Sequence, residues 1–228
     1  MRVLVTRPND DAARIADALQ AMGQEAVVVP LQEVRLRDGP ELALAGVQAV
    51  LATSANGVRA FAKRSARRDV ALFAVGPQTA QAARAAGFAS VRDADGDAAK
   101  LADAVALWTS PRKGALLHVK GSDAPDTLAE LLTAKGFKVR GDVLYDIAPL
   151  RARSALGKAF ASGVDAALFF SPRSAAIFRE NAADFDLSRV AALCISDATA
   201  AALAPLHFRE LRVASRPNQR ALLALIGT

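Results

Sequence analysis

Residues 51–61 read LATSANGVRAF, and residues 168–178 read LFFSPRSAAIF. In both stretches a short apolar segment is followed by a serine and then by an amphipathic segment, with Ser54 aligned to Ser171. A short, continuously apolar strand that leads into a helix is typical of parallel sheets covered on both faces. The first stretch therefore predicts a strand–loop–helix unit, and its second copy predicts that the unit is used twice.

The repeat continues on both sides of these stretches. AVGPQTAQAA (74–83) aligns with CISDATAAAL (194–203), and VLVTRPNDDAARIADALQAMG (3–23) aligns with LLHVKGSDAPDTLAELLTAKG (116–136). The three offsets are 117, 120 and 113 residues, so they agree within loop-length variation. Three matches in consistent register indicate two similar α/β units, each with three equivalent strand-to-helix loops.

Short apolar strands alternate with Ala-rich helical segments along the rest of the chain, which indicates an α/β fold. The first helix is expected at 10–22, where Gly23 ends it. The strands are expected at 3–6, 26–29, 49–52, 72–75, 115–119, 166–170 and 191–195.

Two stretches depart from this rhythm. LQEVRLR (31–37) and VLYDIAP (143–149) alternate apolar and polar residues. Alternation indicates extended segments that are half exposed, unlike the buried strands around them. We interpret the two stretches as a pair of connectors between domains.

Composition excludes several classes of protein. With 52% apolar and 23% charged residues in 228, the chain can bury a sizeable core. The single cysteine, Cys194, excludes a disulfide scaffold and a Cys-based zinc cluster, and two histidines leave little for a metal site. No apolar run reaches the roughly 18 residues of a membrane helix. The N-terminal sequence MRVLVTRPND contains too short an apolar stretch for a signal peptide. A cytoplasmic location is therefore expected, without membrane contact.

Basic residues exceed acidic ones by 29 to 23, a net charge of +6. This excess favours polyanionic ligands, although a genome bias toward Arg and Ala would explain it equally well. The Arg residues are scattered, and one Trp and one Tyr make poor stacking platforms, so nucleic-acid binding is not expected. The glycine-rich fingerprints of dinucleotide and P-loop sites are missing, as are HExxH and GxSxG.

The repeated loops follow strands and open helices, which places them at the carboxyl edge of a parallel sheet, where open α/β folds bind ligands. Helix N-termini present unpaired N–H groups and partial positive charge, to which hydroxyl, amide and basic side chains can add. The other interpretation is plain capping, because Ser, Thr and Asn are preferred N-cap residues. The candidate anion-binding residues are Arg7, Thr53, Ser54, Asn56, Gly76, Thr79, Lys120, Gly121, Ser171, Arg173, Ser174, Ser196 and Thr199.

Tyr145 is the only tyrosine and lies in the second connector. A phenol there could face a space between two domains and donate a proton or a hydrogen bond, or it could pack the connector against one domain. His118 lies within an apolar strand and is expected to be a buried residue with satisfied hydrogen bonds. Cys194, at the end of another strand, is expected to be a free core cysteine.

Six stretches in order carry a resemblance: VTRP (5–8), TSANGVRAF (53–61), AVGPQTAQAA (74–83), VLYD (143–146), FFSPRSAAIF (169–178) and CISDATAAAL (194–203). In this order and spacing the chain resembles the uroporphyrinogen-III synthase (HemD-like) family of tetrapyrrole biosynthesis over nearly its whole length. The resemblance implies two flavodoxin-like parallel-sheet α/β domains joined by a two-stranded linker. The first domain would be 1–33 plus 149–228, the second 38–143, and the connectors about 31–37 and 143–149.

The resemblance also implies a reaction. The family's substrate, hydroxymethylbilane, carries eight carboxylates and is cyclised with inversion of ring D and loss of water, without cofactor or metal. By resemblance Tyr145 is the candidate proton donor, and Thr199 matches a threonine important to activity. A monomer is expected, with a possible transient contact with hydroxymethylbilane synthase, which makes the substrate. The alternative function is a non-catalytic two-lobed protein that binds a small polyanionic ligand.

Three positions depart from the family pattern. Ser196 stands where the family often has Gly, and Arg173 stands where a small residue is common. The loop after Lys120 reads GSDAP, whereas many relatives carry Gly and Arg further along. These departures predict crowding at Ser196, an added carboxylate contact at Arg173, and carboxylate binding by Lys120 in place of its loop.

Overall fold

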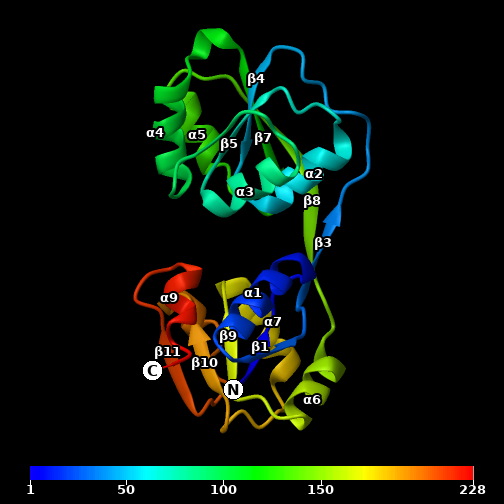
Figure 1. Ribbon diagram of the computed structural model, residues 1–228, viewed down its shortest axis with the longest axis vertical. Helices are drawn as coiled ribbons and strands as arrows, with labels where there is room; N and C mark the ends of the chain where they lie inside the picture. Colours follow the sequence, from blue (N-terminus) through cyan, green and yellow to red (C-terminus); the bar gives the residue numbers. More distant parts are fainter. Residues whose placement is uncertain (228) are drawn as a thin grey trace. The chain divides into compact units, whose positions relative to one another are not determined.

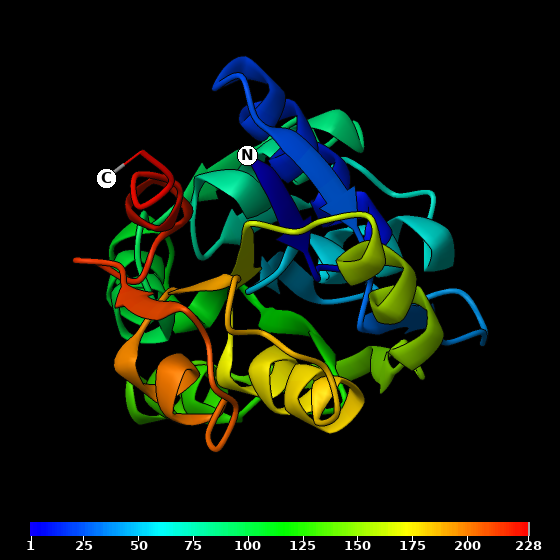
Figure 2. The same cartoon turned by 90° about the horizontal axis from the view of Figure 1, so that it is seen from below.

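The computed structural model describes residues 1–227, except for the side chains of residues 9 and 10. Contacts between Cα atoms divide the chain into two units (Figure 1). Unit 1 consists of Met1–Glu33 and the segment from Ala148 onward, and unit 2 consists of Val34–Ile147. Each unit has its own sheet, wholly parallel in unit 1 and mostly parallel in unit 2, with helices on both faces, so the predicted fold class is confirmed (Figure 1, Figure 2).

Unit 1 contains a five-stranded sheet in the order β11-β10-β9-β1-β2, in which every pair of neighbours is parallel. Its central strand pair joins the beginning of the chain to its last third, since Val3 pairs with Ala166 and Val5 with Leu168. The strands are β1 (Arg2–Val5), β2 (Glu25–Val28), β9 (Ala166–Phe169), β10 (Ala191–Cys194) and β11 (Glu210–Val213). The helices are α1 (Asn9–Ala21), α6 (Arg153–Ala161), α7 (Pro172–Ala182), α8 (Asp197–Ala201) and α9 (Gln219–Leu223).

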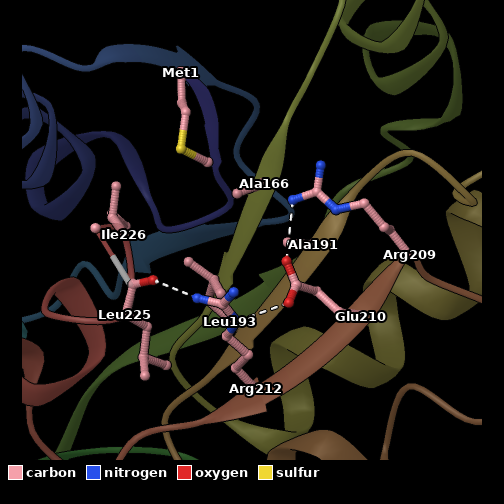
Figure 3. A pocket seen from close by; sticks show the side chains of 10 residues that line it. Met1, Ala166, Ala191, Leu193, Arg209, Glu210, Arg212, Leu225 and Ile226 are labelled. Carbon is pink, nitrogen blue, oxygen red and sulfur yellow. Dashed lines mark hydrogen bonds and ion pairs between the residues drawn. The ribbon is translucent and has the colours of Figure 1, made fainter.

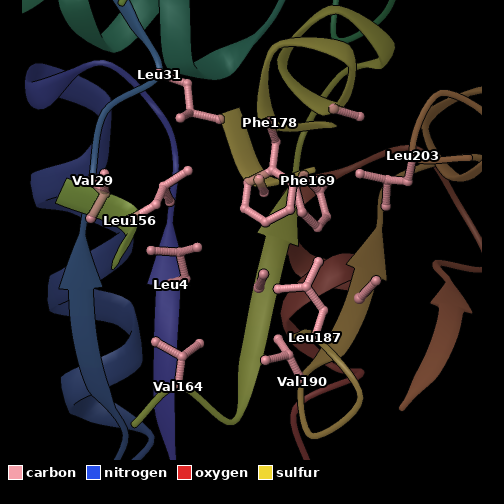
Figure 4. Close-up of a cluster of buried hydrophobic side chains, with 14 of the residues drawn as sticks. Leu4, Val29, Leu31, Leu156, Val164, Phe169, Phe178, Leu187, Val190 and Leu203 are labelled. Carbon is pink, nitrogen blue, oxygen red and sulfur yellow. The ribbon is translucent and has the colours of Figure 1, made fainter. Parts of the chain in front are cut away.

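The inner strands of unit 1, β1, β9 and β10, are apolar on both faces, as buried parallel strands require. On one face Leu4 and Phe169 pack against Phe178 of α7 and Leu156 of α6 (Figure 4). On the other face the alternate strand residues pack against α1 and α9; they include Val3, Val5, Ala166, Leu168, Ala191 and Leu193. This period-two alternation explains why the strands read as continuous apolar runs.

Unit 2 contains a six-stranded sheet in the order β3-β8-β7-β4-β5-β6, with parallel pairing from β8 to β6. One face packs against α2 and α3 through Phe61 and Ala80, and the other against α4 and α5 through Leu101 and Leu128. The strands are β3 (Gln32–Leu36), β4 (Val47–Ala52), β5 (Ala71–Ala74), β6 (Val91–Asp93), β7 (Ala115–Gly121) and β8 (Val139–Pro149). The helices are α2 (Ala55–Arg64), α3 (Pro77–Ala85), α4 (Ala98–Trp108) and α5 (Thr127–Ala134), with a 3-10 turn at Pro111–Lys113.

The two alternating stretches of sequence are β3 and the second half of β8, which are neighbours in the sheet of unit 2. The Arg37 N–H donates to the Leu144 carbonyl, and the Leu150 N–H donates to the Leu31 carbonyl, both at 2.8 Å. The residue numbers rise along one segment as they fall along the other, so the two segments run in opposite directions. Arg37 also holds Asp146 in a two-pronged ion pair, with N–O distances of 2.7 and 2.8 Å. The Arg37 guanidinium and a hydrogen bond from the Ser122 side chain lower the pKa of Asp146 to about 2.

The seven predicted strands match observed ones to within two residues, but the sequence prediction missed β6 and β11. Both are short strands at the outer edges of their sheets and contain charged residues, such as Arg92 in β6 and Arg212 in β11. Because only partly buried strands can carry such residues, they lack the continuous apolar run used to recognise the others. β8 also begins at Val139, four residues before the predicted start at 143.

Candidate functional site

In unit 1, the loops after β1, β9 and β10 lie at one edge of the sheet, because these three strands are adjacent and parallel. The loop after β9 is organised by Ser171, the N-cap of α7. The Ser171 Oγ accepts a hydrogen bond from the Ser174 N–H at 3.1 Å, and the Ser174 hydroxyl donates to the Ser171 carbonyl at 2.9 Å. Capping therefore accounts for both serines locally.

The loop after β10 repeats this arrangement with Ser196 and Thr199. The Ser196 Oγ accepts from the Thr199 N–H at 3.4 Å and lies 3.0 Å from the Thr199 hydroxyl. Thr199 is 0% exposed, whereas Ser196 is half buried. The buried threonine can thus orient the serine hydroxyl, and in this conformation a ligand would contact Ser196 and not Thr199.

Arg7 brings positive charge to the same edge of unit 1. Its guanidinium carbon lies 5.0 Å from the ring centre of Phe170, and it forms an ion pair with Asp11 on α1. Among the residues whose side chains the structure describes, the buried Arg7 Nε has no hydrogen-bond partner. Arg173 lies exposed in the first turn of α7. The three loops of unit 1 therefore combine two cations with two serine-capped helices.

In unit 2, the loops after β4, β5 and β7 likewise lie at one edge of the sheet. Ser54 caps α2, since its Oγ accepts from the Asn56 N–H at 3.1 Å. The Asn56 amide oxygen accepts from Arg59 on the same helix. α3 begins after Gly76, where an added Cβ would meet nothing within 4 Å, and Thr79 in its first turn is buried. Gly76 thus leaves open space above its backbone.

Tyr145 packs against the last residue of β7. Its side chain is 5% exposed and belongs to the apolar core shared with α2 and α3. A Cβ added at Gly121 would lie 2.8 Å from the Tyr145 Cε2 and 3.0 Å from its Cζ, so the ring rests on the glycine backbone. The Ser122 N–H donates to the Tyr145 carbonyl at 3.0 Å. The phenol is therefore fixed beside the end of β7, which carries Lys120.

Lys120 and His118 project from the same face of β7, because they are two residues apart on a strand. The Lys120 side chain is only 13% exposed and pairs with Asp126, which precedes α5. The His118 Nε2 lies 3.5 Å from the hydroxyl of Thr53, the first residue after β4. The pairing of β4 with β7 thus brings Thr53 and Lys120 to one edge of the sheet. His118 and Asp126, which are not among the predicted site residues, lie beside them.

His118 is 1% exposed, as predicted, but the prediction of satisfied hydrogen bonds is wrong for one ring nitrogen. Its Nδ1 is buried without a partner among the described residues. Burial, reinforced by the charge of Lys120, lowers the pKa of His118 to about 4, although Asp126 acts in the opposite direction. The imidazole is therefore neutral at neutral pH.

The depressed pKa of His118 makes the protein less stable in acid. Between pH 6.5 and 4 the unfolded chain binds a proton at this histidine and the folded chain does not, so stability falls as the pH falls. We expect this group to cost roughly 2 kcal/mol of unfolding free energy between pH 7 and pH 5. Urea denaturation at both pH values measures this. The unfolding free energy of His118→Leu should fall between pH 7 and pH 5 by less than that of the wild type, and the difference should be about that amount.

The exposed His207 supplies the matched control, because it is the only other histidine. His207→Gln should lose as much stability as the wild type between pH 7 and pH 5. An equal loss in His118→Leu and the wild type would contradict the assignment to His118.

A cavity of about 140 Å³ lies at the opposite, amino edge of the sheet of unit 1, where β9, β10 and β11 begin (Figure 3). Arg209 and Arg212 line it, but both pair with Glu210, at 3.1 and 2.8 Å. Arg212 also donates to the Leu225 carbonyl at 3.3 Å. These guanidinium groups therefore serve the protein's own contacts, and the cavity lies apart from the candidate site.

The sequence model of the family described as uroporphyrinogen-III synthase HemD matches residues 13–224. The chain belongs to the uroporphyrinogen-III synthase family. Members of this family are enzymes of tetrapyrrole biosynthesis, and the resemblance seen in the sequence is thereby confirmed. None of the curated proteins compared with the chain matches it.

Solved structures of uroporphyrinogen-III synthases share the fold. The uroporphyrinogen-III synthetase of Helicobacter pylori is 19% identical, with a TM-score of 0.64, and the match covers 87% of this chain and 91% of that one. A mutant uroporphyrinogen III synthase of Thermus thermophilus is also 19% identical, with a TM-score of 0.51 and coverage of 100% and 96%. The family's α/β architecture therefore extends over this chain.

The structure also bears on metal binding and on membrane-spanning helices. Among the side chains that the structure describes, no three from His, Cys, Asp or Glu come together as a metal site would require. Over the same residues, no helix combines the length and the apolar character needed to cross a membrane. The sequence analysis missed Asp126 as a site residue. The only available signal was its position shortly after Lys120 and Gly121.

Proposed function

We propose that this chain catalyses its family's reaction, closing hydroxymethylbilane to uroporphyrinogen III with inversion of ring D and loss of water. The observation that supports it most directly is the set of six strand-to-helix loops, three at the carboxyl edge of each parallel sheet. Four of the helices that follow have Ser54, Gly76, Ser171 and Ser196 as their N-cap residues. Such loops offer N–H groups and positive potential to a substrate with eight carboxylates.

The proposed binding residues divide between the two units. In unit 1, Arg7, Ser171, Arg173, Ser174 and Ser196 would bind carboxylates, with Thr199 as a positioning residue for the Ser196 hydroxyl. In unit 2, the corresponding set is Thr53, Ser54, Asn56, Gly76, Thr79, Lys120 and Gly121. Holding a flexible polyanion in one conformation so that the less accessible carbon attacks is the larger part of catalysis in this proposal.

Tyr145 is the proposed acid. The hydroxymethyl C–O bond breaks, the departing oxygen takes a proton to leave as water, and an azafulvene electrophile remains. Attack by the substituted carbon of ring D gives a spiro intermediate, from which the inverted ring is rebuilt. The contact between Tyr145 and Gly121 supports this role, because the same end of β7 carries Lys120, which would hold a carboxylate near the phenol.

The surroundings of the enzyme follow from the same proposal. We expect it to act as a monomer in the cytoplasm and to receive its unstable substrate directly from hydroxymethylbilane synthase through a transient contact. Sedimentation of the two proteins together at micromolar concentration would detect that contact.

A coupled assay tests the function. The purified protein is mixed with porphobilinogen and hydroxymethylbilane synthase, and the oxidised porphyrins are separated by isomer. Hydroxymethylbilane left alone closes without inversion to isomer I, which provides the control. We expect mostly isomer III, whereas isomer I alone from folded protein would overturn the proposal and favour a ligand-binding role.

Tyr145→Phe is expected to lower kcat by about tenfold without abolishing activity. The ring stays on Gly121, so only the hydroxyl is lost, and phenols are weak acids whose proton transfer contributes less than the usual general acid. Initial rates of isomer III formation at saturating substrate measure the change. A kcat equal to that of the wild type would remove Tyr145 from the chemistry.

A further inference from the structure

The ion pair between Lys120 and Asp126 joins two groups in very different environments. The Lys120 side chain is 13% exposed, whereas that of Asp126 is 68% exposed. Both lie at the carboxyl edge of the sheet of unit 2, where β7 ends and α5 begins. The cation is thus nearly enclosed by the protein, and its counter-ion is mostly in water.

An enclosed ammonium group needs a negative partner at all times, because an unpaired charge away from water is costly. The nearby His118 is neutral and cannot supply one. Asp126 can leave at little cost, since its carboxylate is already largely hydrated. Aspartate at the start of a helix usually caps it, yet Asp126 makes no side-chain cap bond to α5 and is directed to Lys120.

In unit 1 the cation at the equivalent position is Arg7, and in its ion pair the carboxylate is the more buried partner. The Arg7 side chain is 36% exposed, and its partner Asp11 is only 16% exposed. A buried carboxylate is a permanent partner, and an arginine has donors left for a second anion. The contrast indicates that Asp11 orients Arg7, whereas Asp126 occupies a position on Lys120 that another carboxylate can take.

We propose that Asp126 is an exchangeable counter-ion, which a carboxylate of the substrate replaces on Lys120. The proposal rests on the proposed function, because that function supplies the polycarboxylate. In the free enzyme Asp126 keeps the ammonium neutralised. When the substrate binds, Asp126 turns to solvent and the incoming carboxylate takes its place, so Lys120 is never left unpaired. Asp126 thus competes with the substrate and lowers its affinity.

The first test measures KM for hydroxymethylbilane. Asp126→Asn keeps a neutral hydrogen-bond acceptor for Lys120 and is expected to lower KM by about fivefold, the factor for removing one partly exposed ion pair. Asp103→Asn is the matched control, because Asp103 is similarly exposed (71%) and pairs with Lys135, at the end of α5. An equal fall in KM in Asp103→Asn would assign the effect to net charge and overturn the proposal.

A Lys120→Met background separates exchange from simple repulsion. Methionine has similar length and no charge, so it suits the enclosed position. If Asp126 acts by occupying Lys120, Asp126→Asn should change KM by less than about twofold in this background. A persistent fivefold fall would show that Asp126 repels the substrate through space, which contradicts the exchange.

A second readout does not depend on activity. Mellitate, a benzene ring with six carboxylates, serves as the probe, and the shift of the melting temperature reports its binding. Mellitate should stabilise Asp126→Asn more than Asp103→Asn or the wild type, and Lys120→Met least. Equal shifts in all four proteins would overturn the exchange, whereas isomer I alone in the coupled assay would overturn only the proposed function.

Discussion

Gly121→Ala is expected to reduce the rate of isomer III formation by about 100-fold, more than the loss of the Tyr145 hydroxyl itself. The new Cβ would lie 2.8 Å from the Tyr145 Cε2, closer than carbon atoms approach, so the ring must move. Tyr145→Phe removes one oxygen, but Gly121→Ala displaces the whole ring and the loop beside Lys120. Displacements of about 1 Å in a catalytic site cost roughly 100-fold.

Gly141→Ala in β8 is the matched control. Gly141 pairs with His118 on the neighbouring β7, and its added Cβ would approach the Lys120 Cε at an ordinary 3.5 Å. Steady-state kinetics of both variants, with melting temperatures to verify folding, measure the difference. Wild-type rates in a folded Gly121→Ala protein would show that the position of Tyr145 is unimportant for the reaction.

Gly57→Ala is expected to lower the free energy of unfolding by about 3 kcal/mol, the cost of severe overpacking. In an ordinary helix this substitution stabilises by about 1 kcal/mol, because alanine is the better helix former. At Gly57 the Cβ would lie 2.8 Å from the Val119 carbonyl oxygen, a backbone atom of β7 that cannot rotate away. α2 must therefore move off the sheet, together with its cap at Ser54.

Gly157→Ala provides the comparison, since Gly157 lies inside α6 and its Cβ would meet the Phe185 ring at 3.4 Å. Urea denaturation of the two variants should give effects of opposite sign or a difference of at least about 2 kcal/mol. Equal effects would mean that the close approach of α2 and β7 is unimportant.

The parallel strands could be predicted because both of their faces are buried. β9 and β10 are buried at every position, which leaves four consecutive apolar residues in each. β6 and β11 could not be found in this way. Each is an edge strand with a neighbour on one side only, so Arg92 and Arg212 stay in contact with water. The alternating pattern did identify β3 and the end of β8 as extended segments, and most of their residues are only partly buried.

The candidate site was predictable where it depends on local sequence and not where it depends on strand register. Ser54 and Ser171 cap the helices that follow them, a relation that spans only two or three residues. The contact between Gly121 and Tyr145 spans 24 residues and exists because the two are paired across β7 and β8. The complete burial of Thr199 likewise follows from packing, and the sequence contains no sign of it.

The pairing of β1 with β9 has a consequence for how the chain is made. Unit 2 is one continuous segment, so all of its contacts are available once residue 147 has left the ribosome. Unit 1 cannot close at that point, because β1 lies between β2 and a strand that begins at Ala166. During synthesis, the first 33 residues must therefore wait, with one hydrogen-bonding edge of β1 unpaired, until β9 (Ala166–Phe169) has been made. The speed of translation beyond residue 147 thus sets how long the unpaired edge of β1 is accessible to chaperones and to other chains.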